Sequence, residues 1–178
     1  MWFGVGLGGN LPGTPSAFRS VVRFLSSDGR LRLTGLSRWY RTVAWEVPAP
    51  PYWNLCAVGT TRMGAVEFFS LMERIERGLP RKGKGKVWPR TLDIDLLFFM
   101  TAPLELPSRL KLPHPSLISR PVLQVILSDA CRSGNLPFSF SGIAYPPGHP
   151  LGGPDPGGYS RRCFPGGKSA CFRVSGKK

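Results

Sequence analysis

The chain has 178 residues, of which 42% are hydrophobic and 19% charged, so it can bury a core without disulfides or a structural metal. Its 24 Lys and Arg residues against 10 Asp and Glu give a net charge of +14, which favours an anionic partner such as nucleic acid, a membrane surface or a phosphate-bearing substrate. The sequence has no membrane-length apolar run, no secretory signal pattern and no Cys-x-x-Cys pair, so we expect a cytoplasmic protein with reduced thiols and no membrane association.

The first 131 residues alternate between strand and helix patterns. Strands are predicted over 3–7, 31–42 (broken at Gly35), 53–60 and 91–100, and helices over 16–25, 65–77 and 117–129. The first helix carries its apolar residues at i, i+3, i+4 and i+7, namely Phe18, Val21, Val22 and Leu25. The order β-α-β-β-α-β predicts an α+β, ferredoxin-like core in which helices pack on an antiparallel sheet.

The composition changes near residue 132. Residues 132–178 contain 10 glycines and 7 prolines and show no helical or alternating apolar pattern. We therefore predict a folded domain over 1–131 and a basic, Pro/Gly-rich tail over 132–178 that is disordered or loosely packed.

A glycine motif near the N-terminus matches a nucleotide-binding pattern in spacing alone. Gly4-x-Gly6-x-x-Gly9 has the dinucleotide fingerprint, but only three residues precede it, where a strand should lead into the motif. We interpret these glycines as a tight turn from strand to loop.

The strongest feature is a pair of acidic residues in an apolar strand. Asp93 and Asp95 are two positions apart, so on a strand their side chains project from one face, about 6.5–7 Å apart. Carboxylates this close repel each other unless a cation lies between them. Arg90 and the basic, glycine-containing run 81–86 stand just upstream, and Mg²⁺-binding carboxylates beside phosphate-binding cations are what phosphoryl transfer needs. The alternative is that each carboxylate pairs with a surface arginine.

Several other residues fit either a site or ordinary structure: Glu73, Glu76, His114, Arg120, Tyr52 and Asn54. The two glutamates fit ordinary surface charge on a helix, but they also lie close in sequence to the basic loop, which fits a role in the site. The histidine and arginine match a structural loop as well as a phosphate site. The aromatic residue and the amide match a strand core as well as a pocket for a flat heterocycle.

The segment Pro89-Arg90-Thr91-Leu92-Asp93-Ile94-Asp95 resembles the signature of the 6-hydroxymethyl-7,8-dihydropterin pyrophosphokinase family of folate biosynthesis. Further matches follow in the family's order: Gly6-Leu7-Gly8-Gly9-Asn10-Leu11, Tyr40-Arg41-Thr42, Tyr52-Trp53-Asn54, Arg74-Ile75-Glu76, Pro113-His114 and Arg120-Pro121. The resemblance implies a ferredoxin-like α+β fold and the transfer of pyrophosphate from ATP to the pterin hydroxymethyl group, with release of AMP.

The resemblance also implies roles for individual residues. The catalytic positions are Arg81, Arg90, Asp93 and Asp95, of which the two aspartates bind two Mg²⁺ ions. The ATP-binding positions are Glu73, Glu76, Lys84, Leu96, His114 and Arg120. The pterin-binding positions are Asn10, Thr42, Trp45, Tyr52, Asn54, Trp88 and Val122. ATP and the pterin are then the partners of a monomer that binds no nucleic acid.

Two alternatives stay open. Trp88 directly precedes Pro89, and Val122 stands where the family usually has Phe, which fits a degenerate relative that binds ATP or pterin with little turnover. A basic RNA-binding module of the same fold class is the other. The sequence lacks the aromatic strand pattern of that module, and paired aspartates on a sheet repel phosphate without a metal.

Overall fold

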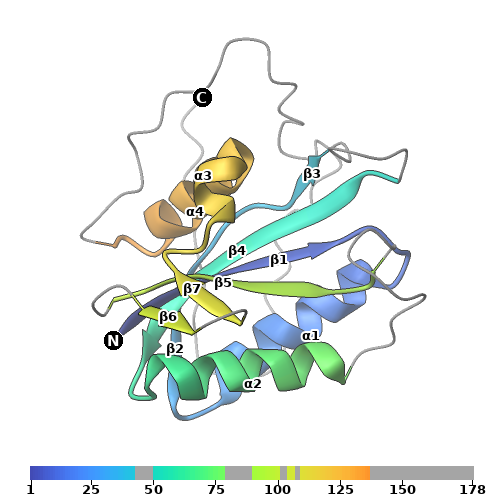
Figure 1. Ribbon diagram of the computed structural model, residues 1–178. Helices are drawn as coiled ribbons and strands as arrows, with labels where there is room; N and C mark the ends of the chain where they lie inside the picture. The colour runs from blue at the N-terminus through green and yellow to red at the C-terminus, as the bar shows by residue number, and fades with distance from the viewer. Residues whose placement is uncertain (43–49, 79–89, 101–103, 107–108, 137–178) are drawn as a thin grey trace.

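An antiparallel sheet of five strands forms the centre of the protein, which a computed structural model describes over residues 1–42, 50–78, 90–100, 104–106 and 109–136 (Figure 1). The strand order is β2 (Leu31–Leu36), β4 (Tyr52–Thr61), β1 (Trp2–Gly9) and β5 (Asp93–Phe99), and β3 (Tyr40–Thr42) pairs with β4 as well. Each crossover skips one strand: β4 lies between β1 and β2, and β1 lies between β4 and β5. This split βαβ arrangement confirms the predicted ferredoxin-like α+β fold.

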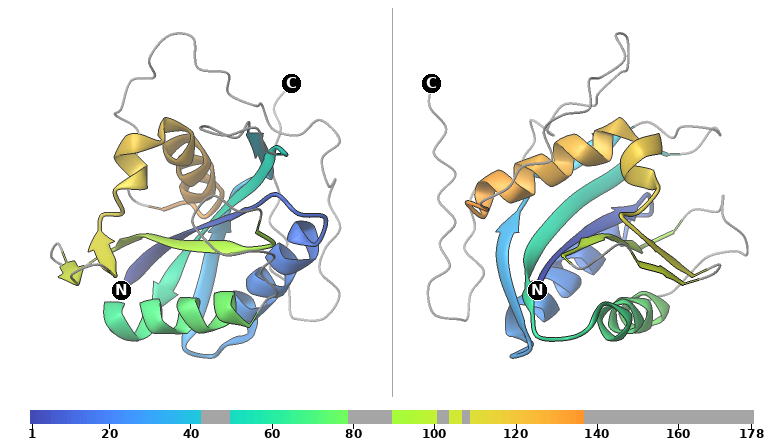
Figure 2. Two further views of the ribbon diagram at one scale, coloured as in Figure 1. Left: turned by 45° about the vertical axis from the view of Figure 1, so that its right-hand side comes forward. Right: turned by 60° about the vertical axis from the view of Figure 1, so that its left-hand side comes forward.

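Helices cover both faces of the sheet (Figure 2). On one face lie α1 (Thr14–Ser27) and α2 (Ala65–Arg77), which pack on Phe3, Val5 and Leu7 of β1. On the other lie the short helix α3 (Ser116–Ser119) and α4 (Pro121–Ser133), which pack on Cys56 and Val58 of β4. The two cores share the sheet because successive strand residues point to opposite faces.

None of the helices in the described ranges has the length and apolar character required to cross a membrane.

Glycines occupy the β1 positions that point toward the α4 face. A Cβ atom on Gly4 would lie 2.1 Å from the ring of Phe98, and one on Gly6 would lie 3.3 Å from Leu97. The missing side chains therefore make room for residues of β5. The turn predicted from the glycine spacing was wrong for Gly4 and Gly6, because β1 continues through Gly9.

The predicted boundaries differ from the structure in three places. The extended run 31–42 is interrupted at residues 37–39, whereas Gly35 lies within β2 where its register with β4 shifts. The last helix begins at Pro121 rather than at residue 117, because proline has no N–H for a helix interior but fits the first turn. A hairpin of β6 (Leu104–Leu106) and β7 (Leu110–Leu112) lies where we predicted only a connection.

The C-terminal part of the folded chain extends slightly past the predicted boundary. Helix α4 runs through Ser133, and Leu136 packs against the core on the α4 face. The remainder of the predicted tail, residues 137–178, lies outside the described residues.

Candidate active site

Asp93 and Asp95 lie at the start of β5 and share the face of the sheet on which α4 packs. They pair with Gly8 and Gly6 of β1, respectively, while Ile94 between them points into the core under α1 and α2. Their side chains are about one-third exposed, 32% and 30%. The spacing of the two aspartates therefore produces the shared face that it predicts.

The two carboxylates have different surroundings. Nη1 of Arg90 lies 2.5 Å from Oδ1 of Asp93, whereas Nε2 of His114 lies 3.8 Å from Oδ1 of Asp95, beyond hydrogen-bond distance. Burial and the negative charge of Asp93 raise the pKa of Asp95 above its ordinary value, although His114, Arg120 and Arg90 oppose the shift. The nearby positive groups thus leave the negative charge of Asp95 incompletely compensated.

The pair of carboxylates is suited to a magnesium ion. Mg²⁺ prefers hard oxygen ligands and is commonly held by one or two carboxylates while phosphate oxygens and water complete its shell. A cation beside Asp95 would also relieve the repulsion from Asp93 that contributes to its raised pKa. Asp93 and Asp95 are therefore the residues that fit this ion.

His114 is held beside Asp95 by its own backbone and its ring. Its N–H donates to the carbonyl of Leu97 at 2.8 Å, which fixes the loop against β5. The N–H of Ser116 donates to Nδ1 of His114 at 3.2 Å, so the neutral ring carries its proton on Nε2, the atom nearer to Asp95. Arg120 lies exposed at the junction of α3 and α4.

Asn54 and Thr42 form a second polar group on this face. Nδ2 of Asn54 donates to Oγ1 of Thr42 at 2.9 Å and to the carbonyl of Tyr52 at 3.4 Å. These bonds turn the other end of the amide, Oδ1, toward Gly8 on the neighbouring strand, 3.8 Å from where a Cβ of Gly8 would lie. The amide therefore presents an acceptor over β1.

Gly8 separates this acceptor from the aspartates. Across the sheet it pairs with Asn54 on one side and with Asp93 on the other. Among the described residues, a Cβ on Gly8 would meet only Oδ1 of Asn54 and Cβ of Asp93, both at 3.8 Å. The space above Gly8 is thus bordered by the amide oxygen of Asn54 and by the Cβ of Asp93, whereas Phe98 fills the corresponding space above Gly4.

Asn10, which we assigned to the pterin site, contacts the backbone of Arg90. Its N–H donates to the carbonyl of Arg90 at 3.0 Å, and its Oδ1 accepts the N–H of Arg90 at 3.1 Å. Its Nδ2 is buried without a hydrogen-bond partner among the described residues. Asn10 thereby holds Arg90 next to Asp93.

Other predicted positions lie apart from this cluster. Glu73 on α2 pairs with Arg77 at 3.0 Å and with Arg109 at 2.6 Å, and Glu76 is partly buried one turn later on the same helix. Leu96 points into the core under α1 and α2, the face opposite to that of the aspartates.

Val122 lies in the first turn of α4 and packs against the core on the α4 face of the sheet. Four predicted positions lie outside the described residues: Trp45, Arg81, Lys84 and Trp88.

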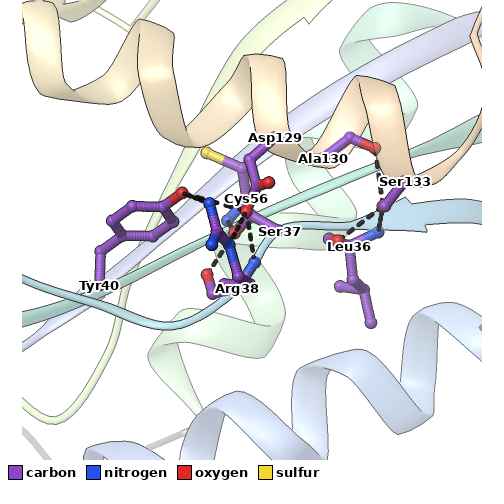
Figure 3. Close-up of polar contacts among 8 residues, drawn as sticks. All are labelled: Leu36, Ser37, Arg38, Tyr40, Cys56, Asp129, Ala130 and Ser133. Atoms are coloured by element: carbon purple, nitrogen blue, oxygen red, sulfur yellow. Dashed lines mark hydrogen bonds and ion pairs between the residues drawn. The ribbon is translucent and has the colours of Figure 1, made fainter. Parts of the chain in front are cut away.

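Sequence reasoning missed a polar cluster that links α4 to the segment between β2 and β3 (Figure 3). Its central member, Asp129, accepts hydrogen bonds from Arg38, which is 91 residues away in the sequence. No motif marks such a pair, because only the packing of α4 on the sheet brings the two residues together.

Comparisons with known proteins agree with the geometry. The family 7,8-dihydro-6-hydroxymethylpterin-pyrophosphokinase matches residues 4–132. A 2-amino-4-hydroxy-6-hydroxymethyldihydropteridine pyrophosphokinase of Synechocystis sp. is 33% identical over 125 residues, which are 70% of this chain and 64% of that protein. A protein of the same name from Pseudomonas putida is 33% identical over 110 residues, 62% of this chain and 91% of the relative. The mitochondrial folate synthesis bifunctional protein of Arabidopsis thaliana is 30% identical over 130 residues, 72% of this chain but only 23% of that protein. The chain thus spans less than two thirds of the Synechocystis and Arabidopsis relatives.

Proposed function

The chain belongs to the 7,8-dihydro-6-hydroxymethylpterin-pyrophosphokinase family, and we propose that it transfers the terminal pyrophosphoryl group of ATP to the hydroxymethyl oxygen of 6-hydroxymethyl-7,8-dihydropterin and releases AMP. The observation that supports this most directly is the pair Asp93 and Asp95 on one sheet face, with Arg90 and His114 beside them. The reaction would serve folate biosynthesis.

On the phosphate side of the site, the proposal assigns the binding of two Mg²⁺ ions to Asp93 and Asp95. Bound Mg²⁺ neutralises charge on phosphate oxygens. Arg90 is held by Asn10 at the start of β5, where its guanidinium can exchange Asp93 for a phosphate oxygen when a cation takes over the carboxylate. His114 donates from Nε2 to a second phosphate oxygen.

On the pterin side, the same face of the sheet provides a hydrogen-bond acceptor and a backbone position without a side chain. Thr42 holds the amide of Asn54 so that Oδ1 accepts an N–H group of the heterocycle. Gly8 has no side chain to obstruct a ring placed between Asn54 and Asp93. This arrangement would bring the pterin hydroxymethyl group toward the aspartates, where the phosphates are bound.

The step itself needs no covalent enzyme intermediate. The hydroxymethyl oxygen gives up its proton to solvent and forms a bond to the β-phosphorus, while the bond from that phosphorus to the oxygen of the α-phosphate breaks and that oxygen stays with AMP. Positioning of the two substrates and neutralisation of phosphate charge then supply most of the rate enhancement.

The remaining assignments rest on the resemblance alone and stay predictions. They give phosphate or nucleotide contacts to Arg81, Lys84, Glu73, Glu76, Leu96 and Arg120, and pterin contacts to Trp45, Tyr52, Trp88 and Val122. The expectations of a cytoplasmic location, a monomer and no nucleic-acid partner are likewise predictions from the sequence.

The test is to incubate the purified protein with ATP, Mg²⁺ and 6-hydroxymethyl-7,8-dihydropterin and to identify the nucleotide product. We expect AMP that depends on the pterin and disappears when Mg²⁺ is chelated. ADP as the product would contradict pyrophosphoryl transfer. Binding of both substrates without any product would instead support the degenerate relative.

A further inference from the structure

We propose that Asp129 of α4 is a positioning residue for the pterin site: it holds Arg38 and Tyr40, and thereby fixes β3 and the orientation of the Asn54 amide. The inference rests on the proposed function, because that function assigns Asn54 to the pterin. Asp129 itself touches neither substrate in this assignment.

The carboxylate of Asp129 is the centre of a compact hydrogen-bonded group (Figure 3). Oδ2 accepts the backbone N–H of Arg38 at 2.8 Å, Nε of Arg38 at 3.2 Å and the hydroxyl of Tyr40 at 3.1 Å. Nη2 of Arg38 also donates to the Tyr40 hydroxyl at 3.2 Å. The Asp129 side chain is only 16% exposed, and hydrogen bonds to a charged acceptor with little access to water are strong.

The protonation state of Tyr40 suits this arrangement. Burial and the negative charge of Asp129 raise the pKa of the Tyr40 phenol above its ordinary value of 10.0. The hydroxyl therefore stays protonated at neutral pH and donates a hydrogen bond to Asp129, while the positive charge of Arg38 balances the charge of the carboxylate.

The link from this group to the pterin site runs through β3, which has only three residues. Tyr40 begins β3 and is the cross-strand partner of Asn54. Thr42 ends β3, and its hydroxyl accepts Nδ2 of Asn54. Among the described residues β3 pairs with β4 alone, so the tie from Tyr40 to α4 is its second anchor.

The position of β3 decides which end of the Asn54 amide faces the ligand. With Thr42 in place, the amide nitrogen is used within the protein and the oxygen faces Gly8. If β3 shifts, the amide keeps only its longer bond to the carbonyl of Tyr52, at 3.4 Å, and can rotate to place its N–H₂ group there instead. A ligand N–H group would then face another donor and lose its hydrogen bond to the Asn54 oxygen. A binding site that depends on such a hydrogen bond loses much of its affinity when a polar group is left unpaired.

Ser133, one helical turn beyond Asp129, provides a matched control. Its hydroxyl donates to the carbonyl of Leu36 at 2.6 Å and accepts the N–H of Leu36 at 2.9 Å. It therefore ties the same helix to β2, and among the described residues its hydrogen bonds do not reach β3. Replacing it should weaken the attachment of α4 without disturbing Asn54.

The experiment compares the wild type with Asp129→Ala, Ser133→Ala and Tyr40→Phe. The probe is the intrinsic fluorescence of 6-hydroxymethylpterin, titrated in the presence of Mg²⁺ and a non-hydrolysable ATP analogue, and the affinity for the analogue is measured separately. We expect Asp129→Ala to weaken pterin binding about tenfold, equivalent to roughly 1.4 kcal/mol, and to leave analogue binding within about twofold, a difference of roughly 0.4 kcal/mol. Ser133→Ala should change neither affinity, even where it lowers the melting temperature.

In steady-state assays the same role predicts a raised KM for the pterin in Asp129→Ala with kcat retained at saturating pterin. Tyr40→Phe removes one hydrogen bond of the group and should move pterin binding in the same direction by less. This variant also decides the question if Asp129→Ala does not fold.

Two results would overturn the inference: equal losses of pterin and analogue affinity in Asp129→Ala, or the same pterin loss in Ser133→Ala. Either would make Asp129 an ordinary structural residue. The proposed function fails in a different way, since it is judged on the wild type. A wild-type protein that binds the pterin but forms no AMP contradicts the activity and leaves the comparison of variants valid, whereas one that binds no pterin contradicts both.

Discussion

Asp93 and Asp95 lie side by side on one face of β5, yet among the described residues only Asp93 forms a close ion pair, with Arg90 at 2.5 Å. The pKa of Asp95 is raised by its burial and by the charge of Asp93. The folded protein without a bound cation therefore disfavours the ionised form of Asp95. This imbalance links the stability of the protein to the chemistry of the site.

The first prediction is that Asp95→Asn raises the melting temperature in the absence of divalent cations. The pKa of Asp95 is higher in the folded than in the unfolded chain, so ionisation of Asp95 lowers the free energy of unfolding. This destabilisation begins above the ordinary pKa of 3.8 and grows until the pH reaches the pKa of the folded state. Thermal unfolding at pH 7 in chelator would measure the difference. A lower melting temperature for Asp95→Asn would contradict this account.

Asp28→Asn is the matched comparison, and its expected effect has the opposite sign. A side-chain hydrogen bond from Arg30 is the main cause that lowers the pKa of Asp28 to about 2. Its ionised form thus stabilises the fold above pH 3.8, and that contribution is lost as pH falls toward 2. Removing this carboxylate, whose partner Arg30 is exposed, should lower the melting temperature slightly at pH 7.

The second prediction concerns Mg²⁺. Adding Mg²⁺ with a non-hydrolysable ATP analogue should raise the melting temperature of the wild type, because a ligand that binds only the folded state stabilises it. Asp95→Asn should show little of this increase, since it lacks one of the two carboxylates. An equal increase in both proteins would argue against cation binding by Asp95.

The third prediction is that Asp95→Ala lowers the turnover number by at least about a hundredfold, the usual scale for removing one electrostatic contact to the transition state. The fold should persist, because the side chain is about one-third exposed and makes no close hydrogen bond to the described residues. The measurement is AMP formation, with circular dichroism to check the fold and Asp28→Asn as the control. A rate near that of the wild type would remove Asp95 from the active site.

The fourth prediction separates two glycines of β1. Gly8→Ala should leave the melting temperature nearly unchanged, because its nearest described neighbours would lie 3.8 Å from the added methyl group, and it should weaken pterin binding. Gly4→Ala should destabilise the protein by about 1–3 kcal/mol through overpacking, since its methyl group would lie 2.1 Å from the Phe98 ring. Unimpaired pterin binding in Gly8→Ala would mean that the ligand lies elsewhere.

The fifth prediction concerns the C-terminal boundary. A chain that ends at Leu136 should keep its melting transition and its activity, because it retains Leu136 on the core and lacks only residues 137–178 of the tail that we predict to be loosely packed. A chain that ends at Cys131 should melt at a lower temperature, since it loses Ser133, which bonds to Leu36, and Leu136, which packs against the core. Loss of the transition in the longer chain would show that residues beyond 136 belong to the fold.

Sequence periodicity was sufficient to predict the layers of this fold. The apolar spacing that begins at Phe18 predicted a helix over 16–25, and a second helix was predicted over 65–77. The structure has helices at Thr14–Ser27 and Ala65–Arg77. The hairpin of β6 and β7 was not predicted, because three-residue strands are too short to show alternation.

The site was predictable only where its residues are close in the sequence. Asp93 and Asp95 share a face because they are two positions apart on a strand, which local geometry alone decides. The placement of Asn54 and Asp93 on either side of Gly8 depends on the register of three strands. The contacts of Asp129 with Arg38 and Tyr40 depend on how α4 packs on the face of the sheet opposite α1. No local pattern in a single sequence predicts that packing.

The glycines of β1 are exposed to different selective pressures. At Gly4 the ring of Phe98 lies over the backbone, so a substitution there is opposed by the loss of a folded protein. At Gly8 no described side chain takes the equivalent place, and under the proposed function a ring of the substrate does. Under the proposed function, a natural variant at position 8 would therefore fold normally but bind the substrate weakly. Chaperones and proteases that remove misfolded proteins would not act on it. Its defect would affect the cell only when the cell must make its own folate.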